Sequence, residues 1–419
     1  MIASVIAVAG AILAVSLFGQ PASAGSSDFQ SLDAQIPLLM AAAHVPGGAI
    51  AIVKDGRLMA VRSYGLANIA TGEAFQPDTL CRIGSISKTV TAVTILNLVD
   101  GGKLGLDDKV FSSLLGNLQP PVGRTVDPRL RDISVRHLLH HTGGHGRASG
   151  VDPLNSALAE TAAEVLHTGK PPGYETIIRY AMGLPLDFDP GTRYSYSNFG
   201  FMVLARVIEK VTGQPYENAV REQVLIPLSL RRMALGRTMP DDLRPGEAHY
   251  YDMPRAPLAL SMFPDARRLM PRPYAQFELE AADGCGQWIA SAIDLARLVA
   301  RVEGSRGPAL FGPDTLKLLF ERPVPFVSED PAGRWWYGLG TVAWPNGAAT
   351  AWNHNGAYYG NIAGYESWGN GYVFAFVFNA TPDNGNEFID GVYGVLTTLG
   401  ATMKDWPTTD LFPRYYPED

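Results

Sequence analysis

The chain has 419 residues, of which 46% are hydrophobic, enough to build one large domain or two interlocked ones. Its 34 basic and 41 acidic residues give a net charge of -7, and no basic run stands out, which argues against a nucleic-acid-binding protein. There is no low-complexity stretch and no repeat of fixed period, which argues against a solenoid.

The first 24 residues carry no charged side chain and end in the small-x-small pattern Ala22-Ser23-Ala24. This composition predicts a signal peptide over residues 1–24, and hence a protein that is exported to the periplasm or secreted. The alternative is an uncleaved membrane anchor, although the apolar run is slightly short for a span. No second run of membrane length follows, so no stable membrane span is expected after signal removal. The sequence does not indicate an oligomeric state.

The N-terminal part of the expected mature chain predicts one helix followed by a hairpin. A helix is expected over Gln30–His44, because its apolar residues form one stripe. Two strand-like runs, Ala49–Val53 and Leu58–Tyr64, flank an Asp55-Gly56 pair, which is a strong hairpin signal. The segment Thr91–Val99 is apolar on nearly every face and is therefore expected to be a buried central helix.

The middle of the chain is less regular. A short helix is expected around Val135–His141 and an amphipathic helix over Phe199–Val211. The segment 141–150 between them is expected to be a flexible loop. Residues 235–282 form a long Pro- and Arg-rich stretch with little periodicity.

The C-terminal part alternates a helix, strands and a helix. Ser291 and Asp294 resemble a capping box, with Asp in place of the usual Glu, at the start of a helix that runs to Val302. Strand-like runs and a last helix follow at Trp336–Trp344, Ala349–His354, Ile362–Trp368, Tyr372–Ala380 and Asn386–Leu399.

These elements predict an α/β (α+β) protein. Strands near both chain ends would form one antiparallel sheet flanked by the terminal helices, with a mostly helical region beside it. We expect a single catalytic domain over residues 25–419. Its α/β half would cover approximately residues 28–100 and 283–405, and its helical half approximately 101–282.

Ser85 and Lys88 are the first candidate catalytic pair. Their spacing of three places both side chains on one face of a helix, one turn apart. A serine hydroxyl needs a base in contact, and a lysine can serve as that base when burial lowers its pKa. Alone, so short a pattern also fits an ordinary polar helix start.

Two further motifs follow in the chain. Tyr196 and Asn198 stand just before an amphipathic helix, where they could relay a proton and orient a substrate. The alternative is a packed tyrosine and an N-capping asparagine. His354 and Gly356 come at the end of a strand, where a glycine lets another backbone or a ligand approach. The alternative there is an Asn-Gly β-turn.

The three motifs occur together, in the order S-x-x-K, Y-x-N and H-x-G, which corresponds to a known signature of serine β-lactamases and penicillin-binding proteins. The chain resembles the serine β-lactamase-like hydrolases over nearly all of residues 30–400. The resemblance is to the class C branch, which includes class C β-lactamases, D-aminopeptidases, DD-carboxypeptidase-like proteins and related carboxylesterases. It implies the β-lactamase/transpeptidase-like fold.

The resemblance also implies roles for individual residues. Ser85 would be the acylated nucleophile and Lys88 its proton acceptor. Tyr196 would shuttle a proton to and from the leaving group and help activate the deacylating water. Asn198 would hold Lys88 and a substrate amide or carbonyl. The backbone N–H groups of Ser85 and Ala357 would form the oxyanion hole. No cofactor is implied.

His354 departs from the β-lactamases, which carry lysine at this position. A neutral histidine is a poorer partner for a substrate carboxylate, and its charge depends on pH. We therefore expect an exported serine hydrolase that acts through an acyl-enzyme on small esters, amides or D-amino-acid peptides. The alternatives are a penicillin-binding or sensor-type protein that is acylated without turnover, and a true β-lactamase.

The chain has two cysteines, Cys81 and Cys285. In an oxidising compartment they could form a disulfide, and two separate buried thiols are the alternative. No spacing of cysteine and histidine suggests a zinc site, so no metal is expected.

Overall fold

The computed structural model describes residues 29–146, 150–152, 154–325, 330 and 332–417. The predicted signal peptide over residues 1–24 lies outside this part of the chain. Within it, none of the helices combines the length and the apolar character that crossing a membrane requires.

An eight-stranded antiparallel sheet forms the centre of the molecule, in the order β3-β2-β1-β13-β12-β11-β10-β9. Its strands are β1 (Gly47–Lys54), β2 (Arg57–Asn68), β3 (Glu73–Ala74), β9 (Trp336–Tyr337), β10 (Val342–Asn346), β11 (Ala349–Tyr358), β12 (Asn361–Ser367) and β13 (Tyr372–Phe378). The N-terminal strand β1 pairs with the C-terminal strand β13, which confirms a sheet built from both chain ends.

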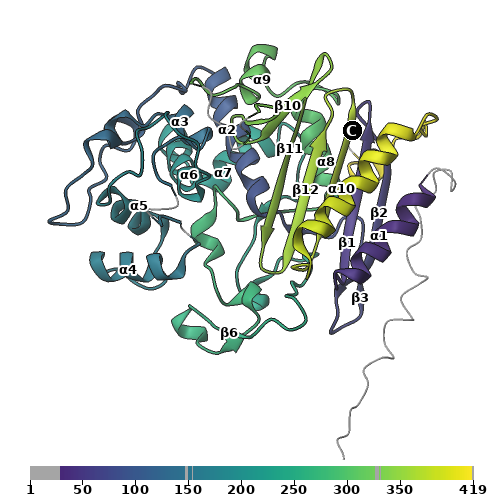
Figure 1. The fold of residues 1–419 in the computed structure, drawn as a ribbon, viewed down its shortest axis with the longest axis horizontal. Helices are drawn as coiled ribbons and strands as arrows, with labels where there is room; N and C mark the ends of the chain where they lie inside the picture. Colours follow the sequence, from purple (N-terminus) through teal and green to yellow (C-terminus); the bar gives the residue numbers. More distant parts are fainter. Residues whose placement is uncertain (1–28, 147–149, 153, 326–329, 331, 418–419) are drawn as a thin grey trace, which may run out of the picture.

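Helices cover both faces of this sheet (Figure 1). On one face lie α1 (Gln30–Ala42) and α10 (Gly385–Thr402), and on the other lie α2 (Ser87–Asp100) and α8 (Ala292–Val302). The alternation along β13 explains both layers, because successive strand side chains point to opposite faces. Phe374, Phe376 and Phe378 pack in the cluster with α1 and α10, while the smaller side chains between them join the cluster with α2 and α8.

A mostly helical region lies beside the sheet (Figure 1). Its helices are α3 (Val135–Leu139), α4 (Ser156–Leu166), α5 (Tyr174–Met182), α6 (Asn198–Thr212) and α7 (Tyr216–Val220). The remaining helices are α9 (Pro313–Leu319) and α11 (Phe412–Tyr415). A small three-stranded sheet joins β4 (Cys81–Arg82), β8 (Trp288–Ala290) and β5 (Ala234–Leu235), and a separate hairpin pairs β6 (Ala259–Leu260) with β7 (Leu269–Met270).

Two local signals in the sequence, a hairpin turn and a helix cap, are confirmed. Asp55 and Gly56 adopt φ values of 50° and 74°, the left-handed pair that a tight hairpin turn requires. Ser291 and Asp294 form the predicted capping box of α8. The alternative of an N-capping asparagine is excluded, because the side chain of Ser197, and not that of Asn198, accepts the backbone N–H at the start of α6.

One expected C-terminal strand is divided in the structure, and the alternative of a turn at Gly356 is excluded. The run Trp336–Trp344 is divided into β9 and β10, because the backbone turns at Gly340 with a φ of 81°. The segment around Gly356 is not a turn, since β11 continues to Tyr358 and pairs with β12 throughout.

The packing on β13 generates a stability prediction. Phe376→Ala should lower the free energy of unfolding by about 3–5 kcal/mol, because the removed ring leaves a cavity between the sheet and α10. Urea unfolding followed by circular dichroism measures this change. Leu38→Ala is the matched control, because this side chain on α1 is 70% exposed and should change stability by less than about 0.5 kcal/mol. Equal effects of the two substitutions would contradict the assignment of the core.

Candidate active site

Ser85 lies in a 3₁₀ turn, Gly84–Ile86, that leads directly into the buried helix α2. The strand segment before this turn is fixed to β8, since the Ile83 N–H donates to the carbonyl of Trp288 at 3.0 Å. The backbone N–H of Trp288 in turn donates to Ser87 Oγ at 3.1 Å. These bonds hold the segment that carries Ser85 from both ends.

Lys88 is the centre of the site. Its side chain is fully buried, and Nζ donates to Ser85 Oγ at 3.1 Å, to Asn198 Oδ1 at 2.7 Å and to the carbonyl of Cys285 at 2.9 Å. Burial lowers the pKa of Lys88 to about 8 and outweighs the nearby Asp152 carboxylate, which raises it. The ammonium can therefore lose its proton near neutral pH while in contact with the hydroxyl of Ser85.

Tyr196 lies beside the same hydroxyl. Its phenol is hydrogen-bonded to Ser85, and Lys88 Nζ is 4.8 Å from the ring centroid. Burial raises the pKa of Tyr196 well above its ordinary value, although the bond with Ser85 lowers it in part. At neutral pH the phenol is protonated, which makes it a proton donor.

Asn198 joins Lys88 to a carboxylate that the sequence analysis missed. Because Oδ1 accepts from Lys88, the amide nitrogen points to Asp152 and donates to its two oxygens at 3.0 and 3.3 Å. We expected that this amide would hold a substrate group as well as Lys88, but in the structure Asp152 occupies its nitrogen. Asp152 lies in a loop without a periodic pattern or motif, so only the fold brings it to the site.

His354 is buried beside this cluster, and both ring nitrogens have protein partners. Nδ1 faces the carbonyl of Asn355 at 2.6 Å and must donate to it, so Nε2 accepts from the hydroxyl of Tyr337 at 2.9 Å. Burial, followed by the charge of Lys88, lowers the pKa of His354 to about 3. At neutral pH the imidazole of His354 is therefore uncharged.

His141 forms a further wall of the site. Its Nδ1 accepts from the backbone N–H of Ser197 at 3.1 Å. The centroid of its ring lies 4.3 Å from the ring centroid of Tyr196 and 4.4 Å from that of Tyr337. The side chain is buried, and burial lowers its pKa well below the ordinary value. This end of the segment expected to be a flexible loop is part of the packed interior.

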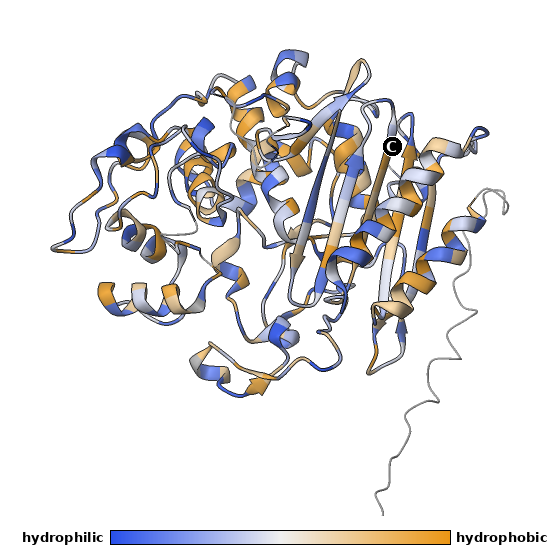
Figure 2. Ribbon diagram, in the orientation of Figure 1, coloured by the Kyte–Doolittle hydropathy of each residue, from blue (hydrophilic) through white to orange (hydrophobic). Residues whose placement is uncertain are grey.

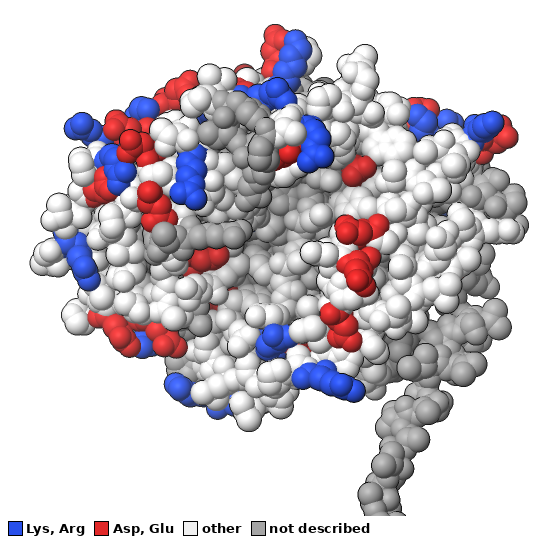
Figure 3. Space-filling model, viewed as in Figure 1, with Lys and Arg blue, Asp and Glu red and all other residues white. Residues whose placement is uncertain are grey.

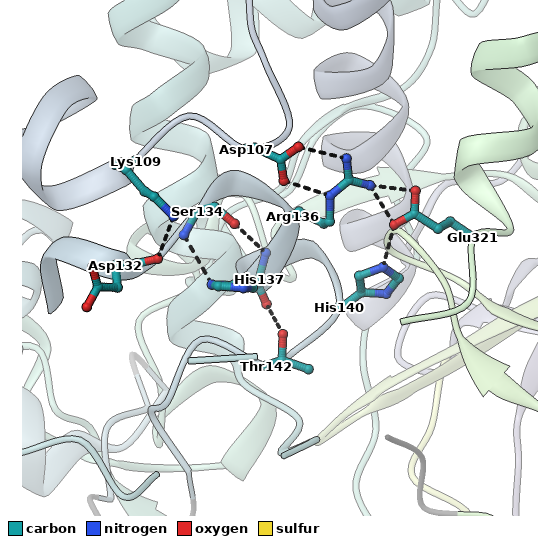
Figure 4. Close-up of polar contacts among 9 residues, drawn as sticks. All are labelled: Asp107, Lys109, Asp132, Ser134, Arg136, His137, His140, Thr142 and Glu321. Carbon is teal, nitrogen blue, oxygen red and sulfur yellow. Dashed lines mark hydrogen bonds and ion pairs between the residues drawn. The ribbon is translucent and has the colours of Figure 1, made fainter. Parts of the chain in front are cut away.

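A charged network anchors Tyr337 from outside the site (Figure 4). Arg136 forms ion pairs with Asp107 and Glu321, and Glu321 also bonds His140 Nε2 at 3.2 Å. Burial raises the pKa of Glu321, but the hydrogen bonds of His140 and Arg136 outweigh it and hold this pKa below its ordinary value. The Nδ1 of His140 reaches the backbone carbonyl of Tyr337 at 3.0 Å. The network thus ties α3 to β9, whose tyrosine holds His354.

The C-terminal half of β11 packs against the turn that carries Ser85. It pairs with β12, but the ladder with β10 ends before it. A Cβ atom on Gly356 would lie 1.8 Å from the carbonyl oxygen of Ile83, so only glycine fits there. A Cβ atom on Gly84 would similarly lie 2.7 Å from the backbone nitrogen of Ala357. These two glycines bring the backbone amides of Ser85 and Ala357 close together.

The two cysteines do not form the disulfide that we considered. Both are free and buried, with Cys81 in β4 and Cys285 contributing its carbonyl to Lys88. Burial raises the pKa of Cys285 to about 12, so it is present as a neutral thiol. Among the described residues, no group of three or more His, Cys, Asp or Glu side chains could hold a metal ion.

Comparisons with known proteins agree with this architecture. The sequence matches the family described as Beta-lactamase over residues 32–398. Penicillin-binding protein 4 of Amycolatopsis lactamdurans is 28% identical over 88% of this chain and 84% of its own length. Esterase EstB of Burkholderia gladioli is 28% identical over 77% of this chain and 82% of its own length.

Among solved structures, the octameric penicillin-binding protein homologue from Pyrococcus abyssi superimposes with a TM-score of 0.66 at 24% sequence identity. The superposition covers 89% of this chain and 78% of that one, and it is a likeness of fold. The match of the family model over residues 32–398 shows that the chain belongs to the β-lactamase family of serine hydrolases.

Proposed function

We propose that this protein is an exported serine hydrolase that forms an acyl-enzyme at Ser85 and acts on small esters or on amides such as D-amino-acid peptides. The observation that carries the proposal is the contact of 3.1 Å between Ser85 Oγ and a buried lysine whose pKa is lowered to about 8. Such a pair supplies the activated hydroxyl that covalent catalysis needs.

Acylation follows from the positions of these groups. Neutral Lys88 takes the hydroxyl proton while Ser85 Oγ attacks the acyl carbon, and the negative charge forms on the former carbonyl oxygen. The backbone N–H groups of Ser85 and Ala357 stabilise that oxygen. When the bond to the leaving group breaks, Tyr196 donates its phenolic proton to it, and the proton held by Lys88 restores the phenol.

Deacylation repeats the steps with water. Tyr196 first passes its phenolic proton to neutral Lys88. A water molecule then gives a proton to the phenolate as it attacks the ester carbonyl, and the bond from the acyl carbon to Ser85 Oγ breaks. Ser85 recovers its proton from Lys88, and the carboxylic acid leaves. Microscopic reversibility requires the same donors in both halves of the reaction.

The charges around the nucleophile favour a neutral acyl group over a β-lactam, which carries a carboxylate. His354 is neutral and both its nitrogens are occupied, so it supplies no cation where the β-lactamases have lysine. Asp152, bonded to Asn198, adds a negative charge beside the site. The similarity to an esterase, EstB, points in the same direction.

Substrate assays with a nucleophile variant test the proposal. The protein is incubated with p-nitrophenyl butyrate, D-alanyl p-nitroanilide and the β-lactam nitrocefin. We expect steady turnover of the ester or the anilide that exceeds turnover of nitrocefin, and a loss of more than about 10³-fold in Ser85→Ala. Ser113→Ala, at an exposed serine in the helical region, is the matched control and should retain wild-type rates.

Two outcomes would contradict the proposal. A single stoichiometric burst without turnover would identify a protein that is acylated but does not hydrolyse. Equal rates in the wild type and in Ser85→Ala would show that the hydrolysis does not pass through this serine.

The lowered pKa of Lys88 predicts a pH dependence. Because the neutral amine is the base, kcat/KM should rise with pH and level off above about 8. Lys88→Arg should remove activity across the whole range, since a guanidinium stays protonated. Ester hydrolysis measured in buffers of constant ionic strength gives the profile. A rate that falls as pH rises through 8 would exclude Lys88 as the base.

The close approach of β11 to the turn that carries Ser85 predicts that a larger residue at position 356 lowers the rate of hydrolysis. Gly356→Ala should lower kcat by about 10²-fold or more, because its methyl group would push the strand away from Ile83 and misplace an oxyanion donor. Gly394→Ala is the matched control, because nothing lies within 4 Å of a Cβ atom added there. An unchanged kcat in Gly356→Ala would contradict the proposed oxyanion hole.

A further inference from the structure

The hairpin of β6 and β7 exposes three leucines. Its strands hydrogen-bond only to each other, so they form a sheet separate from the rest. Leu258, Leu260 and Leu269 are 56%, 49% and 64% exposed. Single exposed leucines are ordinary, but three on one small element form an apolar patch that indicates an interaction surface.

Three arginines accompany these leucines. Arg255, Arg267 and Arg268 are exposed, and no ion pair joins them to any residue that the structure describes. The neighbouring Arg272 differs, because it is paired with Asp252 at the base of the hairpin. Basic side chains gather at this lower edge of the molecule in Figure 3. The patch is therefore positive in a chain whose net charge is -7.

The hairpin projects from the body of the protein but has a fixed base (Figures 1 and 2). The Met262 N–H donates to the carbonyl of Ala275 at 3.1 Å, and Met270 is buried. Shortly after the hairpin, the ring of Phe277 stacks on Tyr358 at the end of β11, with ring centroids 5.1 Å apart. This ring contact links the base of the hairpin to β11, the strand that packs against the turn of Ser85.

We propose that residues 255–269, the Leu/Arg hairpin, dock the protein on a lipid bilayer that contains anionic lipids. The leucines enter the boundary between headgroups and acyl chains, and the arginines contact the lipid phosphates. This docking is a property beyond the proposed hydrolase activity and does not depend on it. It would hold the active site close to a surface in which amphiphilic esters and amides accumulate.

The charges favour a bilayer over a second copy of this chain. In a symmetric pair the same patch meets itself, which would bring six unpaired arginines together. Asp265 is an exposed carboxylate on the hairpin, too little to compensate them. An anionic membrane surface compensates all of these charges at once.

Vesicle sedimentation tests the proposal. The protein used is the chain from Gly25, which retains every described residue and both hydrophobic clusters without the predicted signal peptide. Its binding is compared on vesicles of pure phosphatidylcholine and on vesicles in which a third of the lipid is phosphatidylglycerol. We expect much stronger binding to the anionic vesicles, and weaker binding at high salt.

Two variants separate the contribution of the arginines to membrane binding from that of the leucines. Arg255→Glu/Arg267→Glu/Arg268→Glu should lose more than about 100-fold in affinity, because each arginine near an anionic surface contributes about fivefold. Leu258→Ser/Leu260→Ser/Leu269→Ser should lose binding to a similar extent. Leu38→Ser/Arg131→Ala, which changes an exposed leucine and an exposed arginine elsewhere, should bind as the wild type does. Circular dichroism and thermal unfolding verify that each variant is folded.

Three results would overturn the proposal. One is the absence of binding to anionic vesicles at low salt. Another is binding of equal affinity to both vesicle types, or binding of equal affinity by the wild type and all of the variants. The third is a concentration-dependent dimer, seen by sedimentation velocity, that Leu258→Ser/Leu260→Ser/Leu269→Ser abolishes, since that would assign the hairpin to a second copy.

Discussion

The buried ammonium of Lys88 is the constraint on which the rest of the site depends. Moving such a charge out of water costs several kcal/mol unless hydrogen bonds compensate it. Here three oxygens compensate it, and they come from the 3₁₀ turn, from α6 and from the segment before β8. Breaking any of these contacts would leave the ammonium poorly compensated. The three segments, which are far apart in the sequence, are therefore held around Lys88 Nζ. The helical region and the sheet are thereby held in a single arrangement.

Burial lowers the pKa of Lys88, and no negative charge in direct contact with the amine opposes this effect. The rings of Tyr196 and His141 and the imidazole of His354 surround the amine without a negative charge. The charge of the Asp152 carboxylate raises this pKa, but its oxygens bond the amide of Asn198 and do not contact Lys88 Nζ. A direct ion pair would raise the pKa and remove the base. The charged groups of Figure 4 lie outside the site, and His140 links them to the backbone carbonyl of Tyr337.

Local chemistry and periodicity predicted the elements that depend on neighbours in the chain. The Asp55-Gly56 turn, the capping box of α8 and the spacing of Ser85 and Lys88 are of this kind. The extension of β11 through Gly356 was not predictable, because pairing with β12 overrides the turn preference of an Asn-Gly pair. The positions of Asp152 and of the partners of His354 were not predictable either. They depend on contacts between segments that are far apart in the sequence, and the pattern of a single segment carries no information about such contacts.

The pKa of the Lys88 side chain is the most direct test of this account. Lysine labelled with ¹³C at Cε, observed by NMR during a pH titration, gives one resonance for each lysine, and Lys88→Met assigns the one of interest. The account predicts that this resonance titrates near pH 8, well below the ordinary value of 10.5. Titration together with the exposed lysines would show that the ammonium is not desolvated, and it would contradict the proposed role of Lys88 as the base for Ser85.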